Sequence, residues 1–308
     1  WGVNTVGAWS CDLLHARMPY TPILGMTGSW NDNSAPDFFT PAFEEDMKHS
    51  ADENASRKDD PWLIGYFLGN ALPWATDHRR GHSLFDTYCA FPADAPGKQR
   101  LVAFFQARYE SLEAFGRVWK DAPASWDELA ARPRLVALDE TRAVADREAF
   151  TLEAARKYFE IATSALRAAD PNHLVLGVRF IWQRAPRAVV QACGESCDVV
   201  SINFYETGWL GWLVIHGIAD GVPILTENIN NFAAWYDVTK KPLMITEFSF
   251  RGADAAPPNT YPPGNIVQPV VPTQEDRARK FDQYATMWSS QPWFVGYHWF
   301  EHADEPVE

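Results

Sequence analysis

The sequence predicts an α/β fold, because short apolar runs alternate with longer amphipathic stretches along the whole chain of 308 residues. Several runs are near-continuous Val, Ile and Leu, which is typical of parallel strands covered on both faces. The stretches between them place apolar residues at helical spacing. Alternating strands and helices of this kind indicate a parallel sheet flanked by helices.

The predicted strands account for most of a closed barrel. They are Gly2–Trp9, Thr21–Met26, Trp62–Asn70, His173–Ile181, Asp198–Tyr205, Lys241–Phe248 and Phe294–Phe300. The closed architecture that fits this pattern best is the (β/α)8 barrel, which needs eight strands. Because the first run begins directly after Trp1, we expect the missing first strand to precede it. The chain also ends soon after the last strand without a closing helix, so we expect residues 1–308 to be one barrel domain of a longer protein.

The helices are predicted from periodicity and from capping residues. Residues 147–168 place Phe150, Ala154 and Tyr158 on one face, and the pattern stops at Pro171. Thr273 is a candidate N-cap for a helix that runs to about Ser289, with acidic residues in its first turn. The Pro-rich segment 255–272 is predicted to be a long loop over the mouth of the barrel.

Charge and hydropathy exclude several classes of partner. The net charge is −13, from 40 acidic and 27 basic residues, and no Lys/Arg cluster is present. This argues against nucleic acids and anionic membranes and suits a neutral substrate. The longest apolar stretch, 209–225, is broken by His216, Asp220 and Pro223, so no membrane span is predicted.

The chain holds 4 cysteines, which are too few for a disulfide scaffold. Cys193 and Cys197 could form a bridge, but two free thiols are favoured. A lone C-x3-C is also poor support for a zinc site. We expect no metal and no cofactor, since dinucleotide, Walker, zinc-protease and nucleophile-elbow motifs are all missing.

The predicted strand ends are rich in Trp, Asn, Tyr and carboxylate side chains. In barrels of this kind the chemistry lies at the carboxyl ends of the strands. Sugars present apolar C–H faces and rims of hydroxyl groups, so aromatic, amide and carboxylate side chains suit them. The residues at these ends are Trp9, Asn70, Ala71, Trp182, Asn203, Tyr205, Glu247 and Trp299.

Glu247 is the most informative of these residues. It ends the apolar run "PLMITEF", where a carboxylate loses solvation and must be compensated or functional. The alternative is a structural ion pair with Arg179 or Arg251.

Four motifs in order then give a resemblance to a known family. "GNALPW", "SINFY", "MITEFSFRG" and "VGYHWFEHADEP" resemble the clan A retaining glycoside hydrolases, which are (β/α)8 barrels, and among them the agarases and β-galactosidase-like enzymes. Residues 109–129 also resemble a helix and loop of the β-galactosidase type. The resemblance covers essentially the whole chain.

The resemblance implies a role for each matching residue. Glu247 matches the nucleophile, Asn70 the asparagine that binds the sugar 2-hydroxyl, Tyr205 the tyrosine that hydrogen-bonds the nucleophile, and Trp299 a stacking platform. Ala71 occupies the position of the general acid/base glutamate, which is the departure from the family pattern. Further candidates for sugar contacts are Trp9, Trp74, Trp182, Asn203, His298 and Glu301; a satisfied polar cluster is an equal reading for His298 and Glu301.

Alanine cannot donate or accept a proton, so two explanations compete. A natural pseudoenzyme could have lost the glutamate and kept the pocket for binding, or Glu was replaced by Ala to trap intact substrate. We favour the replacement, because the other residues expected from the family pattern, such as Asn70 and Trp74, are still present, whereas gradual loss of function would usually have changed them as well. Asp77 and Asp86 are alternative acids on a loop beyond the strand end.

The sequence therefore predicts a retaining β-glycoside hydrolase in an inactivated form, acting on a β-linked oligo- or polysaccharide. The alternatives are a non-catalytic carbohydrate-binding barrel and metal-assisted hydrolysis, for which His298 and His302 lack carboxylates at ligand spacing. The resemblance implies a secreted or periplasmic protein of polysaccharide degradation.

Overall fold

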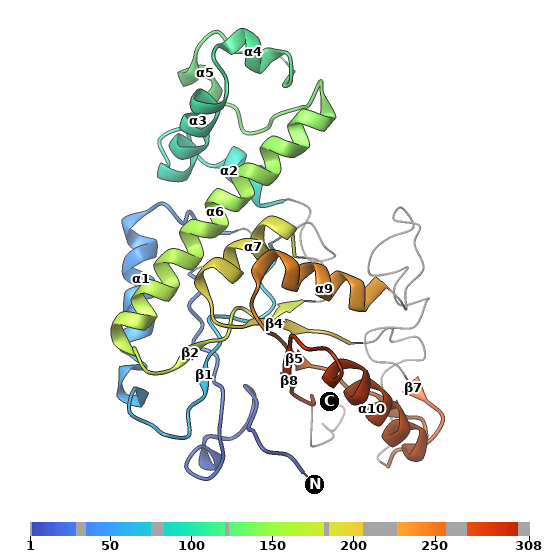
Figure 1. Cartoon of the computed structure of the whole chain (residues 1–308). Coiled ribbons are helices and arrows are strands. Elements are labelled where there is room, and N and C mark those ends of the chain that lie inside the picture. The colour runs from blue at the N-terminus through green and yellow to red at the C-terminus, as the bar shows by residue number, and fades with distance from the viewer. Residues whose placement is uncertain are drawn as a thin grey trace.

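The structure is a parallel α/β assembly with a lobe of short helices at one end (Figure 1). It is a computed structural model that describes residues 2–28, 35–74, 83–120, 123–181, 185–205, 227–256 and 270–300, without the side chains of 227–231. The helices are α1 Pro41–Asp52, α2 Leu84–Ala90, α3 Pro96–Arg108, α4 Leu112–Gly116, α5 Trp126–Ala130, α6 Glu140–Ala169, α7 Arg187–Ser196, α9 Glu227–Thr239 and α10 Gln274–Ser289, with short 3-10 turns at Asp12–Leu14 and Ala55–Arg57.

The strand pairings among the described residues are all parallel. The strands are β1 Gly65–Tyr66, β2 Leu174–Val175, β3 Phe180–Ile181, β4 Val200–Asn203, β5 Leu243–Glu247, β6 Arg251–Gly252, β7 Val270–Val271 and β8 Phe294–Tyr297. Strand β1 pairs with β2, β3–β4–β5–β8 form a second sheet, and β6 pairs with β7. Backbone hydrogen bonds from Leu68 to Gly177 and from Ala71 to Arg179 continue the β1 ladder into the second sheet.

The first two predicted strands form only isolated bridges. Val6 pairs with Tyr20, Tyr20 with Leu63, and Ile23 with Phe67, so 2–9 and 21–26 are extended segments that precede β1 in the ladder. Within the described residues no pairing joins the first segment to β8, and the barrel is not closed. A closed barrel was predicted. The described residues instead form an open parallel α/β ladder, whose two edges, the first extended segment and β8, are not hydrogen-bonded to each other.

The predicted strand His173–Ile181 is divided into β2 and β3. Gly177 has φ +80° and Arg179 has φ +49°, and two left-handed residues interrupt regular pairing between the two short strands. This interruption lies next to the candidate site.

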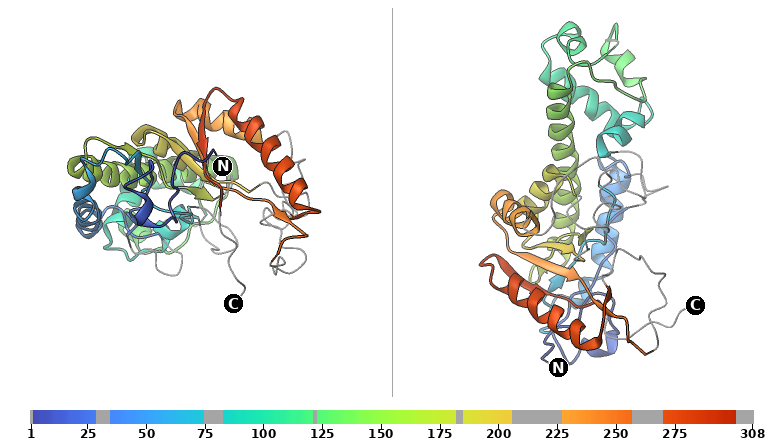
Figure 2. Two further views of the ribbon diagram at one scale, coloured as in Figure 1. Left: turned by 90° about the horizontal axis from the view of Figure 1, so that it is seen from below. Right: turned by 90° about the vertical axis from the view of Figure 1, so that its right-hand side faces the viewer.

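The helices cover the outer face of the ladder. The longest, α6, packs between α1 and α7, while α7 also packs on α9 (Figures 1 and 2). Helix α6 begins earlier than predicted because Asp139 caps it by accepting from the Arg142 amide. The prediction for α10 is confirmed: Thr273 and Asp276 form a capping box, and the helix ends at Ser289.

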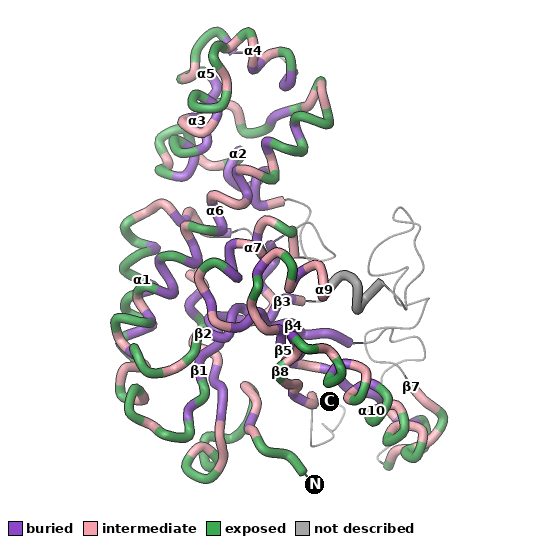
Figure 3. The backbone as a smooth tube through the Cα atoms, viewed as in Figure 1, coloured by how far each residue is buried: buried purple, intermediate pink, exposed green. Residues whose placement is uncertain are grey.

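The core lies between the ladder and these helices, and the tube in Figure 3 is buried throughout β1 and β4 and over most of β5. Cys193 and Cys197 are both buried free thiols in and just after α7, as favoured from the sequence. None of the described helices is long and apolar enough to cross a bilayer.

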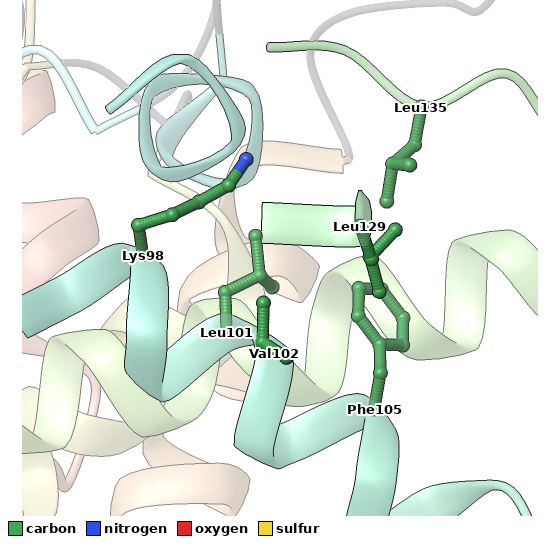
Figure 4. A pocket seen from close by; sticks show the side chains of 6 residues that line it. All are labelled: Lys98, Leu101, Val102, Phe105, Leu129 and Leu135. Carbon is green, nitrogen blue, oxygen red and sulfur yellow. The ribbon is translucent and has the colours of Figure 1, made fainter. Parts of the chain in front are cut away.

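Helices α2 to α5 form a separate lobe around the outer end of α6 (Figures 1 and 2). The lobe contains a small apolar pocket, lined by Lys98, Leu101, Val102, Phe105, Leu129 and Leu135 (Figure 4). The Lys98 ammonium donates to the Cys89 and Arg132 carbonyls. Lys98 is the one titratable residue of this lining, and these two carbonyls engage its ammonium group.

The buried carboxylate of Asp146 ties the lobe to α6. It accepts hydrogen bonds from the indole of Trp119, from the hydroxyl of Tyr109 and from the guanidinium of Arg108. Asp146 and Trp119 are both buried. Charge-assisted bonds to a buried carboxylate are each stronger than neutral ones.

We expect Asp146→Asn to lower the free energy of unfolding by about 2 kcal/mol, because the amide turns an NH2 group toward a donor and loses the charge. Urea unfolding measures this effect. The matched control is Glu113→Gln, which removes an exposed carboxylate paired with Arg117 in the same lobe and should change stability by less than about 0.5 kcal/mol. Equal effects in the two variants would contradict the assignment.

Candidate active site

The ends of four neighbouring strand segments meet at one edge of the ladder. Ala71 follows β1, Arg179 precedes β3, Asn203 ends β4 and Glu247 ends β5. The Ala71 amide donates to the Arg179 carbonyl at 3.1 Å, and the Phe204 amide donates to the Glu247 carbonyl at 2.9 Å. Parallel pairing therefore brings residues far apart in the sequence to the same edge.

A β-bulge sets which side chains lie opposite each other. Ile202 pairs with Ile245, but Asn203 pairs with Glu247, so Thr246 is the extra residue on β5. Bulges re-aim side chains and are enriched next to active sites. Here the bulge places Asn203 opposite Glu247 in the ladder.

The Glu247 carboxylate accepts three hydrogen bonds from three different segments. Arg179 Nη2 donates to Oε1 at 2.7 Å, the indole Nε1 of Trp9 donates to Oε1 at 2.9 Å, and Tyr205 Oη donates to Oε2 at 3.1 Å. The side chain of Glu247 is 13% exposed, so the carboxylate is largely removed from water yet open at one side. The ion pair with Arg179, named from the sequence as the alternative reading of Glu247, is thus present in the structure.

A second set of hydrogen bonds brings Asn70 to the same group. Asn203 Nδ2 donates to Asn70 Oδ1 at 3.0 Å, and Thr246 Oγ1 donates to Asn203 Oδ1 at 2.7 Å. The three side chains connect the end of β1 to the end of β5. The amide of Asn70 is thus oriented within the site by its neighbours.

Ala71 directly follows Asn70 and has φ +51°. A non-glycine residue in the left-handed region costs roughly 1–2 kcal/mol and marks a functional or strained position. The left-handed turn ends the β1 segment at the site, where position 71 contributes only a methyl group.

The charges of the site follow from burial and contact. Burial lowers the pKa of Arg179, which is 1% exposed, while the Glu247 charge opposes this effect. Burial raises the pKa of Tyr205, and the Glu247 carboxylate raises it further. Tyr205 therefore stays a neutral hydrogen-bond donor and Arg179 a cation.

His298 lies beside this group with its ring enclosed. The ring meets Phe67 edge to face at 6.4 Å between centroids, and a Cβ on Gly7 would lie 3.2 Å from its Nδ1. Burial, together with the positive charge of Arg179, lowers the pKa of His298 to about 4. The imidazole is therefore neutral at neutral pH.

The tryptophans occupy different places. Trp9 is 57% exposed, with the Arg179 guanidinium carbon 5.5 Å from its ring centre, so its other face is open for stacking. Trp299 is half-buried, meets Phe248 edge to face and lies under Arg277. Trp74 is buried against Phe38, Tyr158 and Phe159, a location that packing accounts for without a sugar.

Trp182, Glu301, His302 and Asp77 lie outside the described residues. Asp86, the other alternative acid, lies in the capping box of α2, where its carboxylate accepts hydrogen bonds from Ser83. It is therefore part of a helix cap and does not lie at the strand ends. Among the described side chains, no group of three or more His, Cys, Asp or Glu residues is placed to hold a metal ion.

From the sequence, Arg179 was expected only as the partner of Glu247 in a structural ion pair, and no role was predicted for Thr246. The signal for Arg179 was a cation inside the apolar run "LVLGVRF". A buried charge there needs an acid from another strand.

The chain is similar to β-agarases over its whole length. It is 26% identical to β-agarase B of Vibrio sp. (strain JT0107) over 330 residues, which covers 100% of this chain and 31% of that protein. The crystal structure of an agarase, AgWH50C, superposes with a TM-score of 0.79 at 25% identity and covers 97% of this chain and 41% of that chain. No family model matches the chain.

A β-galactosidase from the haloarchaeon Halorubrum lacusprofundi shares the fold, with a TM-score of 0.59 at 16% identity over 91% of this chain and 42% of that chain. The chain spans about a third of the curated agarase it matches. The agarase-like resemblance of the sequence motifs is thus supported by independent comparisons of sequence and of structure.

His298 predicts a dependence of stability on pH. In the unfolded chain the imidazole of His298 has its ordinary pKa of 6.5, whereas in the folded chain its pKa is about 4. The stabilisation is complete above pH 6.5 and is lost as the pH falls toward 4. When the pH falls from about 7.5 to about 4.5, the free energy of unfolding of the wild type should decrease by about 2–3 kcal/mol more than that of His298→Gln. Urea unfolding at the two pH values measures the difference.

The control for this measurement is His49→Gln, because His49 is exposed on α1 and pairs with the exposed Glu53. It should follow the wild-type pH profile. A His298→Gln profile parallel to wild type would show that the imidazole is not held neutral.

Proposed function

We propose that this chain carries the catalytic barrel of a retaining β-glycoside hydrolase of the agarase type, in a form that lacks its acid/base residue. The observation that carries the proposal is the convergence of Trp9, Arg179 and Tyr205 on the Glu247 carboxylate at the strand ends. Asn70 and Ala71 lie at the same edge, joined to it through Asn203 and Arg179.

Glu247 is the nucleophile in this proposal. Its oxygen attacks the anomeric carbon and forms a glycosyl-enzyme, while a second carboxylate about 5–5.5 Å away protonates the departing oxygen. That second group would stand at position 71, where alanine can neither protonate the leaving group nor activate water. The chain should therefore be arrested at the first step with ordinary substrates.

The substrate class follows from the relatives and from the side chains. Two agarases with matching fold and sequence favour a β-linked galactan, which the chain would bind as a neutral polysaccharide. The exposed ring of Trp9 beside the carboxylate suits stacking on a sugar face, and the Asn70 amide suits its 2-hydroxyl. We place the protein with secreted or periplasmic polysaccharide degradation.

A second candidate function is a non-catalytic carbohydrate-binding barrel. The observation that favours it is Ala71 itself, since the site keeps its amide and aromatic groups without a proton donor. Such a protein would bind oligosaccharides and gain no turnover from a restored glutamate.

We expect Ala71→Glu to hydrolyse agarose or another β-linked galactan with net retention of anomeric configuration. Because general acid catalysis contributes about 10²–10⁴-fold, the native chain should be slower by that factor. NMR of the first product anomer measures the stereochemistry. Azide should partly restore turnover of the native chain on a dinitrophenyl β-galactoside, giving a β-galactosyl azide.

Two controls accompany this measurement. Glu247→Gln in the Ala71→Glu background should abolish hydrolysis, and Ala93→Glu, on an exposed loop, should leave the native chain as it was. Oligosaccharide binding without any turnover in Ala71→Glu would favour the binding barrel and overturn the hydrolase.

A further inference from the structure

Arg179 contacts both positions that the proposed reaction requires. Its carbonyl accepts the Ala71 amide at 3.1 Å, and its Nη2 donates to Glu247 Oε1 at 2.7 Å. The same nitrogen donates to the Thr246 carbonyl at 3.1 Å, and the Arg179 amide donates to Ser201 Oγ at 3.0 Å. A single residue therefore links the end of β1 to the end of β5 across β4.

We propose that Arg179 is a positioning residue that fixes Glu247 relative to position 71 and leaves Oε2 of Glu247 as the attacking oxygen. This inference rests on the proposed hydrolase function. It concerns a residue that touches the nucleophile rather than the sugar.

The surroundings of Arg179 make it a rigid link. The residue is buried, and its guanidinium carbon lies 5.5 Å from the ring centres of both Trp9 and Phe67. Its backbone is held at φ +49° by the hydrogen bonds to Ser201 and Ala71. A planar guanidinium near two aromatic rings holds its partner in one place better than a flexible ammonium could.

The two oxygens of Glu247 are held differently. Oε1 accepts from both Arg179 and Trp9, whereas Oε2, within the described part of the chain, accepts from Tyr205 alone. A carboxylate oxygen has about two lone-pair sites, so both sites of Oε1 are engaged and one site of Oε2 is left. Oε2 is therefore the oxygen available to bond with an anomeric carbon.

Position matters because the reaction needs a near-attack geometry. A misplacement of about 1 Å can cost about 10²-fold in rate. A residue that only neutralised a buried charge would change stability without a selective effect on the chemical step. The two roles therefore differ in their kinetics.

The experiment uses the native chain with 2,4-dinitrophenyl β-D-galactoside. Glu247 Oε2 bonds to the anomeric carbon, and dinitrophenolate leaves with the electron pair of the broken C–O bond and needs no proton. Because the alanine at position 71 cannot activate water, the adduct accumulates. Single-turnover release of dinitrophenolate and the mass of the labelled peptide report this step alone.

We expect Arg179→Ala to slow the step at saturating substrate by about 10²-fold while KM changes by less than about 3-fold. Added guanidinium at millimolar concentration should recover part of the rate. Arg179→Lys, which keeps the charge without the planar fork, should fall between wild type and the alanine variant. Circular dichroism checks the fold, and Arg179→Lys carries the test if the alanine variant does not fold.

The matched control is Arg156→Ala, which breaks an Arg–Glu pair with Glu195 on the outer surface of α6 and α7 and should leave the step unchanged. An unchanged rate in both Arg179 variants, or a loss confined to KM, would overturn the positioning role while leaving the hydrolase standing. If the native chain forms no adduct at Glu247 and Ala71→Glu hydrolyses no galactan, the proposed function itself fails.

Discussion

The arrangement of the site depends on one electrostatic constraint: a carboxylate at the end of a buried strand must be compensated. Glu247 gains its donors from Trp9, Arg179 and Tyr205, which belong to three segments far apart in the chain. Each donor reaches Glu247 only when its segment is correctly aligned with β5. The need to compensate the carboxylate therefore favours this alignment of the parallel ladder. Removing water from the ions strengthens their attraction but also makes an unpaired partner costly.

The same constraint explains two irregularities of the backbone. The bulge at Thr246 pairs Glu247 with Asn203, and the left-handed residues Ala71 and Arg179 lie after β1 and directly before β3. Non-glycine residues in this conformation persist only where surrounding contacts hold them. At position 71 the hydrogen bond from the backbone amide to the Arg179 carbonyl holds this conformation with a methyl group as the side chain.

Much of the site followed from residue types at strand ends, because a parallel ladder brings those ends together and a polar residue after an apolar run is costly without partners. Glu247, Tyr205, Asn70 and Asn203 were predicted to lie together in this way, and hydrogen bonds connect Tyr205 to Glu247 and Asn203 to Asn70. Pattern alone could not show that Arg179 joins two strand ends or that a bulge sets its partner, since both depend on register. Trp74 was a lesser candidate for lining an outer sugar subsite, but it is buried against three aromatic rings.

The most direct test of this account is a crystal structure of the Ala71→Glu variant. The account predicts that the restored carboxyl group faces Glu247 across one open site, with the two carboxyl groups about 5–5.5 Å apart, as retaining hydrolysis requires. A separation of about 6.5–9.5 Å would indicate inversion, and a side chain directed away from Glu247 would contradict the assignment of both residues.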